Sequence, residues 1–193
     1  MPNIGSDGED NIRLALHTCC GPCLIEPLRL LSRQFADIVS VYYNPNIAPP
    51  EEYLRRRDTF VAYARSQGLR YVELEYGPSL WADATRDTPL PPLRCEQCYR
   101  IRFERATAWA AQNGCTHFAT TLTVSPYQNQ SCIERVAREF CTRHDLVYAG
   151  YDFSPYYQNS VLISRQMGMY RQKYCGCAPS ECEASQQRAR RKK

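Results

Sequence analysis

The sequence contains no run of 18 apolar residues, the length at which a segment becomes a candidate membrane-spanning helix, so we expect no membrane partner. Its first ten residues, MPNIGSDGED, lack the basic start and apolar middle of a secretory signal peptide. We therefore expect a cytoplasmic protein, held under reducing conditions that disfavour disulfide bonds. The sequence also has neither a G-x-G-x-x-G motif nor a Walker lysine–serine pair, which argues against a glycine-rich phosphate loop.

Positive charge is scarce outside the C-terminal end. The net charge is +4, but the last six residues, RARRKK, hold five basic groups, and 19 basic and 20 acidic residues remain without them. Such a basic end can bind nucleic acid or can be a solvated terminus. A chain of 193 residues fits one globular domain. We predict a disordered segment over 1–11, a single α/β catalytic domain over 12–182 and a basic tail over 183–193.

Cysteine is abundant, with 11 residues, and seven of them fall into three short clusters: Cys19, Cys20, Cys23, Cys95, Cys98, Cys175 and Cys177. The odd count and the expected reducing compartment argue against disulfides. The two C-x-x-C pairs have the spacing at which two thiolates reach one metal, so the clusters predict a metal centre. Three isolated cysteines read as small buried apolar residues: Cys115, Cys132 and Cys141. Cys182 stays unassigned.

Strand-like and helix-like segments alternate along the chain. Apolar runs predict strands over 12–17, 37–43, 70–74, 117–121 and within 146–150. Helical spacing predicts helices that begin at 22, cover 51–66, 79–86, 130–144 and 159–168, and include the RCEQC segment. This alternation predicts an α/β fold with three layers and a mostly parallel, Rossmann-like sheet of about five strands.

The first cysteine cluster directly follows the first predicted strand. Parallel sheets bind ligands outside the carboxyl ends of their strands, so Cys19, Cys20 and Cys23 occupy the position of a phosphate loop. Seven clustered thiols exceed the four that one structural zinc uses, whereas a [4Fe-4S] cluster uses three or four. The residues therefore allow one iron–sulfur cluster and leave three thiols for a second metal or for chemistry.

Five segments, taken together and in order, resemble one protein family. They read HTCCGPC, YYNPNIAPPEEYLRRR, RCEQCYRIRFERA, TTLTVSPYQN and MYRQKYCGC. With the predicted strand before HTCCGPC, the resemblance runs from about residue 12 to 177. In this combination the chain resembles the QueH family, the cobalamin-independent epoxyqueuosine reductases.

The resemblance implies a fold like that of the HUP-type nucleotide hydrolases and the reduction of epoxyqueuosine to queuosine at the wobble position of tRNA. It implies a [4Fe-4S] cluster and an adjacent metal ion, taken to be iron, both held by the seven clustered cysteines. The electron donor is unidentified. Some family members carry an aspartate where this chain has Cys23. The chain also departs from the family after Asp152 and Phe153, where SPYYQNSVL replaces the usual lysines and glycine.

Epoxide reduction also needs a proton donor and a surface that binds an RNA loop. Candidate donors are His17 and Asp152, with two tyrosines as further candidates. Aromatic stacking and phosphate contacts recognise single-stranded RNA, and the candidate residues are Arg55, Arg56, Arg171, Lys173, Tyr156 and Tyr157. Two alternatives remain open. One is a zinc-stabilised RNA-binding module in which RCEQC and YCGC form one tetrahedral site, and the other is a thiol enzyme that transfers sulfur to tRNA.

Overall fold

The computed structural model describes residues 12–190, and these form a five-stranded sheet in which every strand runs parallel to its neighbours. The strands are β1 (Arg13–Thr18), β2 (Asp37–Tyr42), β3 (Arg70–Glu73), β4 (His117–Thr120) and β5 (Val147–Tyr148). They lie in the order β3-β2-β1-β4-β5, so β1 is central. The predicted parallel sheet of about five strands is confirmed.

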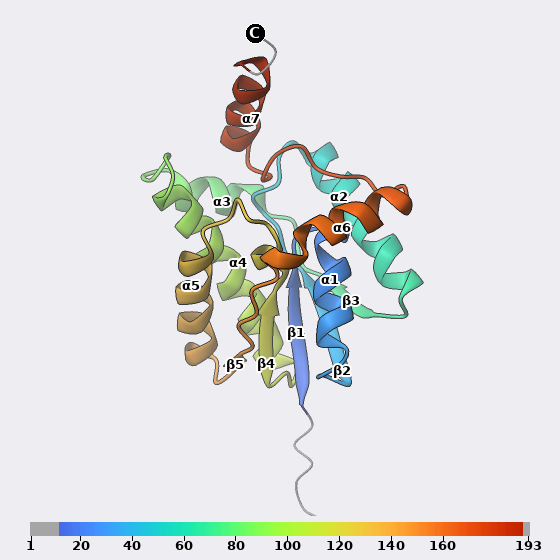
Figure 1. Ribbon diagram of the computed structural model, residues 1–193. Helices are drawn as coiled ribbons and strands as arrows, with labels where there is room; N and C mark the ends of the chain where they lie inside the picture. The colour runs from blue at the N-terminus through green and yellow to red at the C-terminus, as the bar shows by residue number, and fades with distance from the viewer. Residues whose placement is uncertain (1–11, 191–193) are drawn as a thin grey trace, which may run out of the picture.

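Helices cover both faces of the sheet, which confirms the predicted three layers (Figure 1). One face carries α1 (Gly21–Leu31) and α2 (Pro50–Ser66), with α6 (Tyr157–Gln166) packed on α1; the other carries α4 (Leu93–Gln112) and α5 (Gln130–Arg143). The remaining elements are α3 (Pro78–Thr85), the short 3-10 helices η1 (Thr121–Val124) and η2 (Ser154–Tyr156), and α7 (Ala178–Arg190).

The core consists of two apolar clusters, one on each face of the central strand. Leu14 and Leu16 of β1 pack in the cluster that contains Leu24 and other α1 and α2 residues. Ala15, between them, packs on the opposite face in the cluster that contains Phe103 of α4. Side chains alternate between the faces of a strand, and both faces are covered here. The continuous apolar run that predicted a strand is therefore the run of a strand buried on both sides.

The strand order places a crevice at the carboxyl end of β1. The chain first builds outward through β2 and β3 and then returns to β4 on the other side of β1. Loops that leave β1 and β4 therefore diverge to opposite faces, and such a switch point is where open α/β sheets bind ligands. The HTCCGPC segment leaves β1 at this point, and η1 follows β4 there.

Helix α7 was not predicted. The last predicted helix, over 159–168, corresponds to α6. Only Ser180 of α7 is buried, so the segment has no apolar stripe from which to read a helical period. Its signals are at the ends instead: Glu181 lies in the first turn, and Arg188 and Arg190 lie in the last, where they complement the helix dipole.

The predicted boundary between domain and tail at 182/183 falls inside α7. The N-terminal segment 1–11 and residues 191–193 lie outside the described residues. Within 12–190, no helix has both the length and the apolar character needed to cross a membrane.

Candidate metal centre

Three cysteine thiols converge where β1 ends and α1 begins. Cys19 follows β1, Cys20 is the N-cap residue of α1, and Cys23 lies in the first helical turn beside Pro22. The three sulfurs all lie within 4.8 Å of one another, and those of Cys19 and Cys20 are 3.8 Å apart. The short C-C-x-x-C spacing therefore produces one compact trio of soft ligands at the switch point of the sheet.

The trio shares its charge unequally. Hydrogen bonding with the Cys20 and Cys23 thiols holds the pKa of Cys19 well below its usual range, with help from the Arg102 charge and the Thr121 hydroxyl. The same hydrogen bonds, together with burial, raise the pKa values of Cys20 and Cys23. Cys19 is therefore the thiol of the trio that ionises first. The thiolate is the form of cysteine that binds a metal, so the site favours that form at Cys19.

The other four clustered cysteines come from two segments. Cys95 and Cys98 lie in the first turns of α4, and Cys175 and Cys177 lie in the loop that precedes α7. Burial raises the pKa values of Cys95 and Cys98, and the charges of the Cys175 and Cys177 sulfurs raise them further. The two segments therefore lie beside each other. Within residues 12–190, however, these four sulfurs do not approach one another as closely as the trio does.

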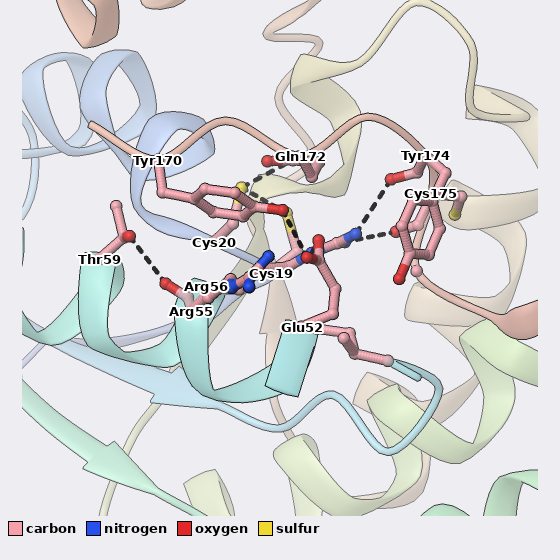
Figure 2. Close-up of polar contacts among 12 residues, drawn as sticks. Cys19, Cys20, Glu52, Arg55, Arg56, Thr59, Tyr170, Gln172, Tyr174 and Cys175 are labelled. Carbon is pink, nitrogen blue, oxygen red and sulfur yellow. Dashed lines mark hydrogen bonds and ion pairs between the residues drawn. The ribbon is translucent and has the colours of Figure 1, made fainter. Parts of the chain in front are cut away.

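A buried arginine holds the segment 170–177 over the cysteines (Figure 2). Arg56 donates to the carbonyl oxygens of Cys175 at 2.8 Å and Tyr174 at 3.2 Å, and its Nε lies 2.7 Å from the Glu52 carboxylate. The Tyr170 hydroxyl donates to the same carboxylate, and Gln172 donates to the Cys20 sulfur at 3.3 Å. Contacts from α2 and from the first cysteine cluster thus fix the backbone that presents Cys175.

Gly176 allows this close approach. Its φ is +149°, and a Cβ there would lie 2.8 Å from the Asn46 side chain and 3.2 Å from Arg56. The YCGC motif therefore needs glycine between its two cysteines, because any side chain would push the segment away from Arg56.

Gln128 adds a contact from the loop after η1. Its Nε2 donates to the Cys175 sulfur at 3.4 Å, and its Oε1 accepts from the Tyr99 hydroxyl at 2.7 Å. Gln128 of the SPYQN segment thus links Tyr99 of the RCEQCY segment to Cys175 of YCGC. In the sequence these are three separate motifs.

A cavity of about 300 Å³ opens between these segments. Its lining includes one sulfur from each side, Cys19 and Cys175, with polar and aromatic side chains: Asn44, Asn46, Arg56, Arg102, Tyr127, Gln128, Tyr157, Gln172, Lys173 and Tyr174. Arg102 and Asn44 are functional candidates that the sequence did not single out. Both lie inside motifs that resemble the family, Asn44 in YYNPNIAPPEEYLRRR and Arg102 in RCEQCYRIRFERA. Sequence spacing alone, however, does not distinguish a buried arginine from a solvated one.

His17 does not fit the proton-donor role predicted for it. The residue is fully buried, Nδ1 lies 2.9 Å from the Thr120 hydroxyl, and Nε2 lies 3.2 Å from the Tyr43 carbonyl oxygen. Burial and the Arg102 charge lower the pKa of His17 to about 3. A neutral ring with both nitrogens engaged joins β1 to β4 and to the end of β2, and it carries no imidazolium proton at neutral pH.

Asp152 is exposed and lies outside the cavity lining. Its carboxylate accepts a hydrogen bond from the backbone N–H of Ser154 at 2.8 Å, at the start of η2. This is the local turn contact that aspartate commonly makes. The structure thus gives Asp152 a structural contact, and a proton-donor role stays a prediction.

The predicted RNA-binding residues separate into two groups. Arg56 is 2% exposed and committed to Glu52 and the 170–177 segment, so it does not fit a phosphate-binding role. Five are accessible at least in part: Arg55, Tyr156, Tyr157, Arg171 and Lys173. Tyr157 and Lys173 line the 300 Å³ cavity, whereas Tyr156 lies beside Arg29, whose guanidinium is 5.9 Å from the ring centre.

The isolated cysteines behave mostly as expected. Cys115 and Cys141 are buried at 6% and 2% exposure, which confirms their reading as apolar core residues. Cys132 is only half-buried, because it lies in the first turn of α5, where the Asn129 side chain caps its backbone N–H. Cys182 is exposed on α7.

Comparison with known proteins gives consistent matches over nearly the whole chain. The family model described as epoxyqueuosine reductase QueH matches residues 14–183. Three curated relatives carry that same name. The protein from Histophilus somni is 32% identical over 177 residues, which cover 87% of this chain and 72% of the relative. That from Staphylococcus epidermidis is 32% identical over 184 residues (89% and 76%), and that from Thermotoga maritima is 31% identical over 182 residues (90% and 93%).

A solved structure also shares the fold. The U34-tRNA thiolase NcsA from Methanococcus maripaludis, with its [4Fe-4S] cluster, matches with a TM-score of 0.55 at 14% identity. The match covers 93% of this chain and 67% of that one. At this identity the likeness establishes the Rossmann-like architecture alone.

Proposed function

The chain belongs to the epoxyqueuosine reductase QueH family, and we propose that it reduces epoxyqueuosine to queuosine in the anticodon loop of tRNA. The reaction breaks both epoxide C–O bonds, forms a C=C bond and releases the oxygen as water. It therefore consumes two electrons and two protons. Side chains do not supply electrons at the required potential, so a redox cofactor is needed. The observation that carries the proposal is the trio of thiols at the switch point beside a polar cavity.

The trio fits a single metal ion. Two sulfurs held at about 2.3 Å by one tetrahedral ion lie roughly 3.8 Å apart, and Cys19 and Cys20 have that separation. We assign Cys19, Cys20 and Cys23 to the predicted second metal, taken as iron. A cysteine in place of the aspartate of some relatives makes this site all-thiolate.

The remaining four cysteines fit a [4Fe-4S] cluster. Each thiolate of such a cluster binds a different iron, so its ligands lie further apart than those of one ion. Cys95, Cys98, Cys175 and Cys177 supply four thiols from two segments, and among residues 12–190 no three of these sulfurs lie within 4.8 Å of one another. When bound, the cluster supplies electrons one at a time.

The geometry favours this reading over a zinc-stabilised RNA-binding module. That alternative requires the RCEQC and YCGC thiols to surround one ion. Among residues 12–190, the group of three or more metal-binding side chains within 4.8 Å of one another is Cys19, Cys20 and Cys23, not these four. A closed tetrahedral zinc site at RCEQC and YCGC is therefore less well supported.

The cavity supplies contacts for a single-stranded nucleotide. Tyr127 is 84% exposed and lies edge-on to Tyr157, with ring centres 6.1 Å apart. Exposed aromatic rings at a cavity stack on unpaired bases. Lys173 lines this cavity and Arg171 lines a neighbouring pocket beside Cys23. We propose that both bind phosphate, with Arg55 of α2 as a further exposed cation.

Tyr157 takes the place of His17 as the proton-holding side chain that lines the cavity. Burial raises the pKa of its hydroxyl, with a further contribution from Tyr127. The hydroxyl therefore keeps its proton at neutral pH and can hydrogen-bond to an oxygen in the cavity.

Anaerobic purification followed by iron, sulfide and zinc analysis tests the cofactor assignment. We expect about four irons with acid-labile sulfide plus one further metal. Turnover on epoxyqueuosine-containing tRNA, followed by nucleoside mass spectrometry with a chemical reductant as electron source, tests the reaction. Stoichiometric zinc without sulfide would favour the RNA-binding module, and a thiolated nucleoside would favour sulfur transfer.

A further inference from the structure

Three arginines among residues 12–190 are at most 3% exposed: Arg56, Arg94 and Arg102. They differ in their partners. Arg56 is paired with Glu52 at 2.7 Å, and Arg94 is paired with Glu183 at 2.9 Å. None of the ion pairs within residues 12–190 includes Arg102. A buried charge is strongly unfavourable unless an opposite charge compensates it, so Arg102 requires a counter-charge that is not a carboxylate.

The neutral contacts of Arg102 do not supply that charge. Its Nη2 donates to the Asn44 side-chain oxygen at 2.6 Å, and its Nε is buried without any partner. Asn44 is itself fixed, because its Nδ2 donates to the Thr18 carbonyl oxygen at the end of β1. The guanidinium is thus held by one rigid amide, and the rest of its hydrogen-bonding capacity is left free.

The position of Arg102 points to the thiolates. It lies one helical turn beyond Cys98 on α4, and it lines the same 300 Å³ cavity as Cys19. Arg102 therefore lies near members of both cysteine sets, and thiolates are the negative groups that these two sets provide.

We propose that Arg102 is the counter-charge of the thiolate–metal centre, oriented by Asn44, and that it favours the reduced state of this centre. The inference deepens the proposed function, on which its redox part rests. Each electron that enters the centre adds one negative charge, and a fixed cation in a buried environment stabilises that charge. Arg102 is a positioning and tuning residue in this proposal, and Asn44 positions it.

The decisive measurement is the midpoint potential of the anaerobically purified protein, obtained by titration with a low-potential chemical reductant and monitored by electron paramagnetic resonance. Arg102→Gln should favour the oxidised state at least tenfold, which is a shift of about 59 mV to more negative potential for one electron. Arg102→Lys keeps the charge and should stay near the wild type. Asn44→Asp gives Arg102 a carboxylate partner, so it should shift the potential in the same direction as Arg102→Gln.

Arg105→Gln is the matched control. It removes the same charge from the same helix, but Arg105 is exposed, so solvent screens it and the potential should not change. If Arg102→Gln does not fold, as judged by circular dichroism of the metal-free protein, Asn44→Asp decides the matter. A wild-type potential in folded variants at both positions would overturn the proposal, as would a raised KM for tRNA with an unchanged potential, which would mean that Arg102 binds substrate phosphate.

The two proposals fail in different ways. If the wild type holds zinc and no iron–sulfur cluster, the proposed reductase function is wrong. Charge compensation is then tested by zinc affinity, which Arg102→Gln should lower at least tenfold and Arg102→Lys should not. Equal affinities would overturn the role of Arg102 in that case too.

Discussion

The Arg56 contact network makes a quantitative prediction, because it concentrates a buried ion pair and two backbone hydrogen bonds on one side chain. The side chains of Arg56 and Glu52 are 3% and 6% exposed. Arg56→Gln leaves the Glu52 carboxylate buried with only the Tyr170 hydroxyl as a partner. Removing one member of a buried pair typically costs about 3–5 kcal/mol. For a chain of this size that corresponds to a fall in Tm of roughly 6–20 °C.

The assay is urea unfolding of the metal-free protein under anaerobic, reducing conditions, with iron content measured separately after reconstitution. Arg55→Gln, an exposed neighbour on the same helix, is the control and should change the free energy of unfolding by less than about 0.5 kcal/mol. The double variant Glu52→Gln/Arg56→Gln should be more stable than Arg56→Gln alone, because it leaves no unpaired charge. If Arg56→Gln unfolds like Arg55→Gln but binds tRNA more weakly, Arg56 is a phosphate-binding residue after all.

Three further predictions test the site. Cys98→Ser should lose cluster iron and all turnover, since serine is a poor ligand for soft sites, whereas Cys132→Ser should keep both. Iron content and single-turnover conversion of the two variants, measured side by side, check this. The opposite result would mean that the metal-binding and structural cysteines were assigned wrongly. Lys173→Gln should weaken tRNA binding and flatten the slope of log affinity against log salt by about 0.7–0.9, as measured by filter binding, and an unchanged slope would place Lys173 away from phosphate. Gln128→Leu should destabilise the metal-free protein by about 1–3 kcal/mol, because it removes the acceptor to which the Tyr99 hydroxyl donates. Gln187→Leu on α7, which is exposed, serves as the control in the same urea unfolding assay, and equal losses would refute the role of Gln128.

The sequence was sufficient for the sheet because strand burial leaves a direct record in composition. RLALHT of β1 is apolar on both faces because helices cover both faces, and a run of this kind can be read without tertiary information. Helix α7 left no such record, since it buries only Ser180.

The trio of Cys19, Cys20 and Cys23 was likewise determined by the sequence alone. Its members are separated by at most four positions, so a strand end followed by a helix start brings their sulfurs together whatever the rest of the chain does. Local spacing fixes local geometry, and this is why short cysteine motifs can be read reliably.

Only the tertiary structure decided the surroundings of His17, Arg56 and Arg102. In the sequence each is a polar residue inside a motif that resembles the family. From the sequence we predicted proton donation for His17 and RNA binding for Arg56. Their burial and their partners come from segments 26 to 119 positions away. A polar side chain acquires its charge state and its role from the groups that replace water around it, and for these three residues those groups are brought together only when β1, α2, α4 and the 170–177 segment meet.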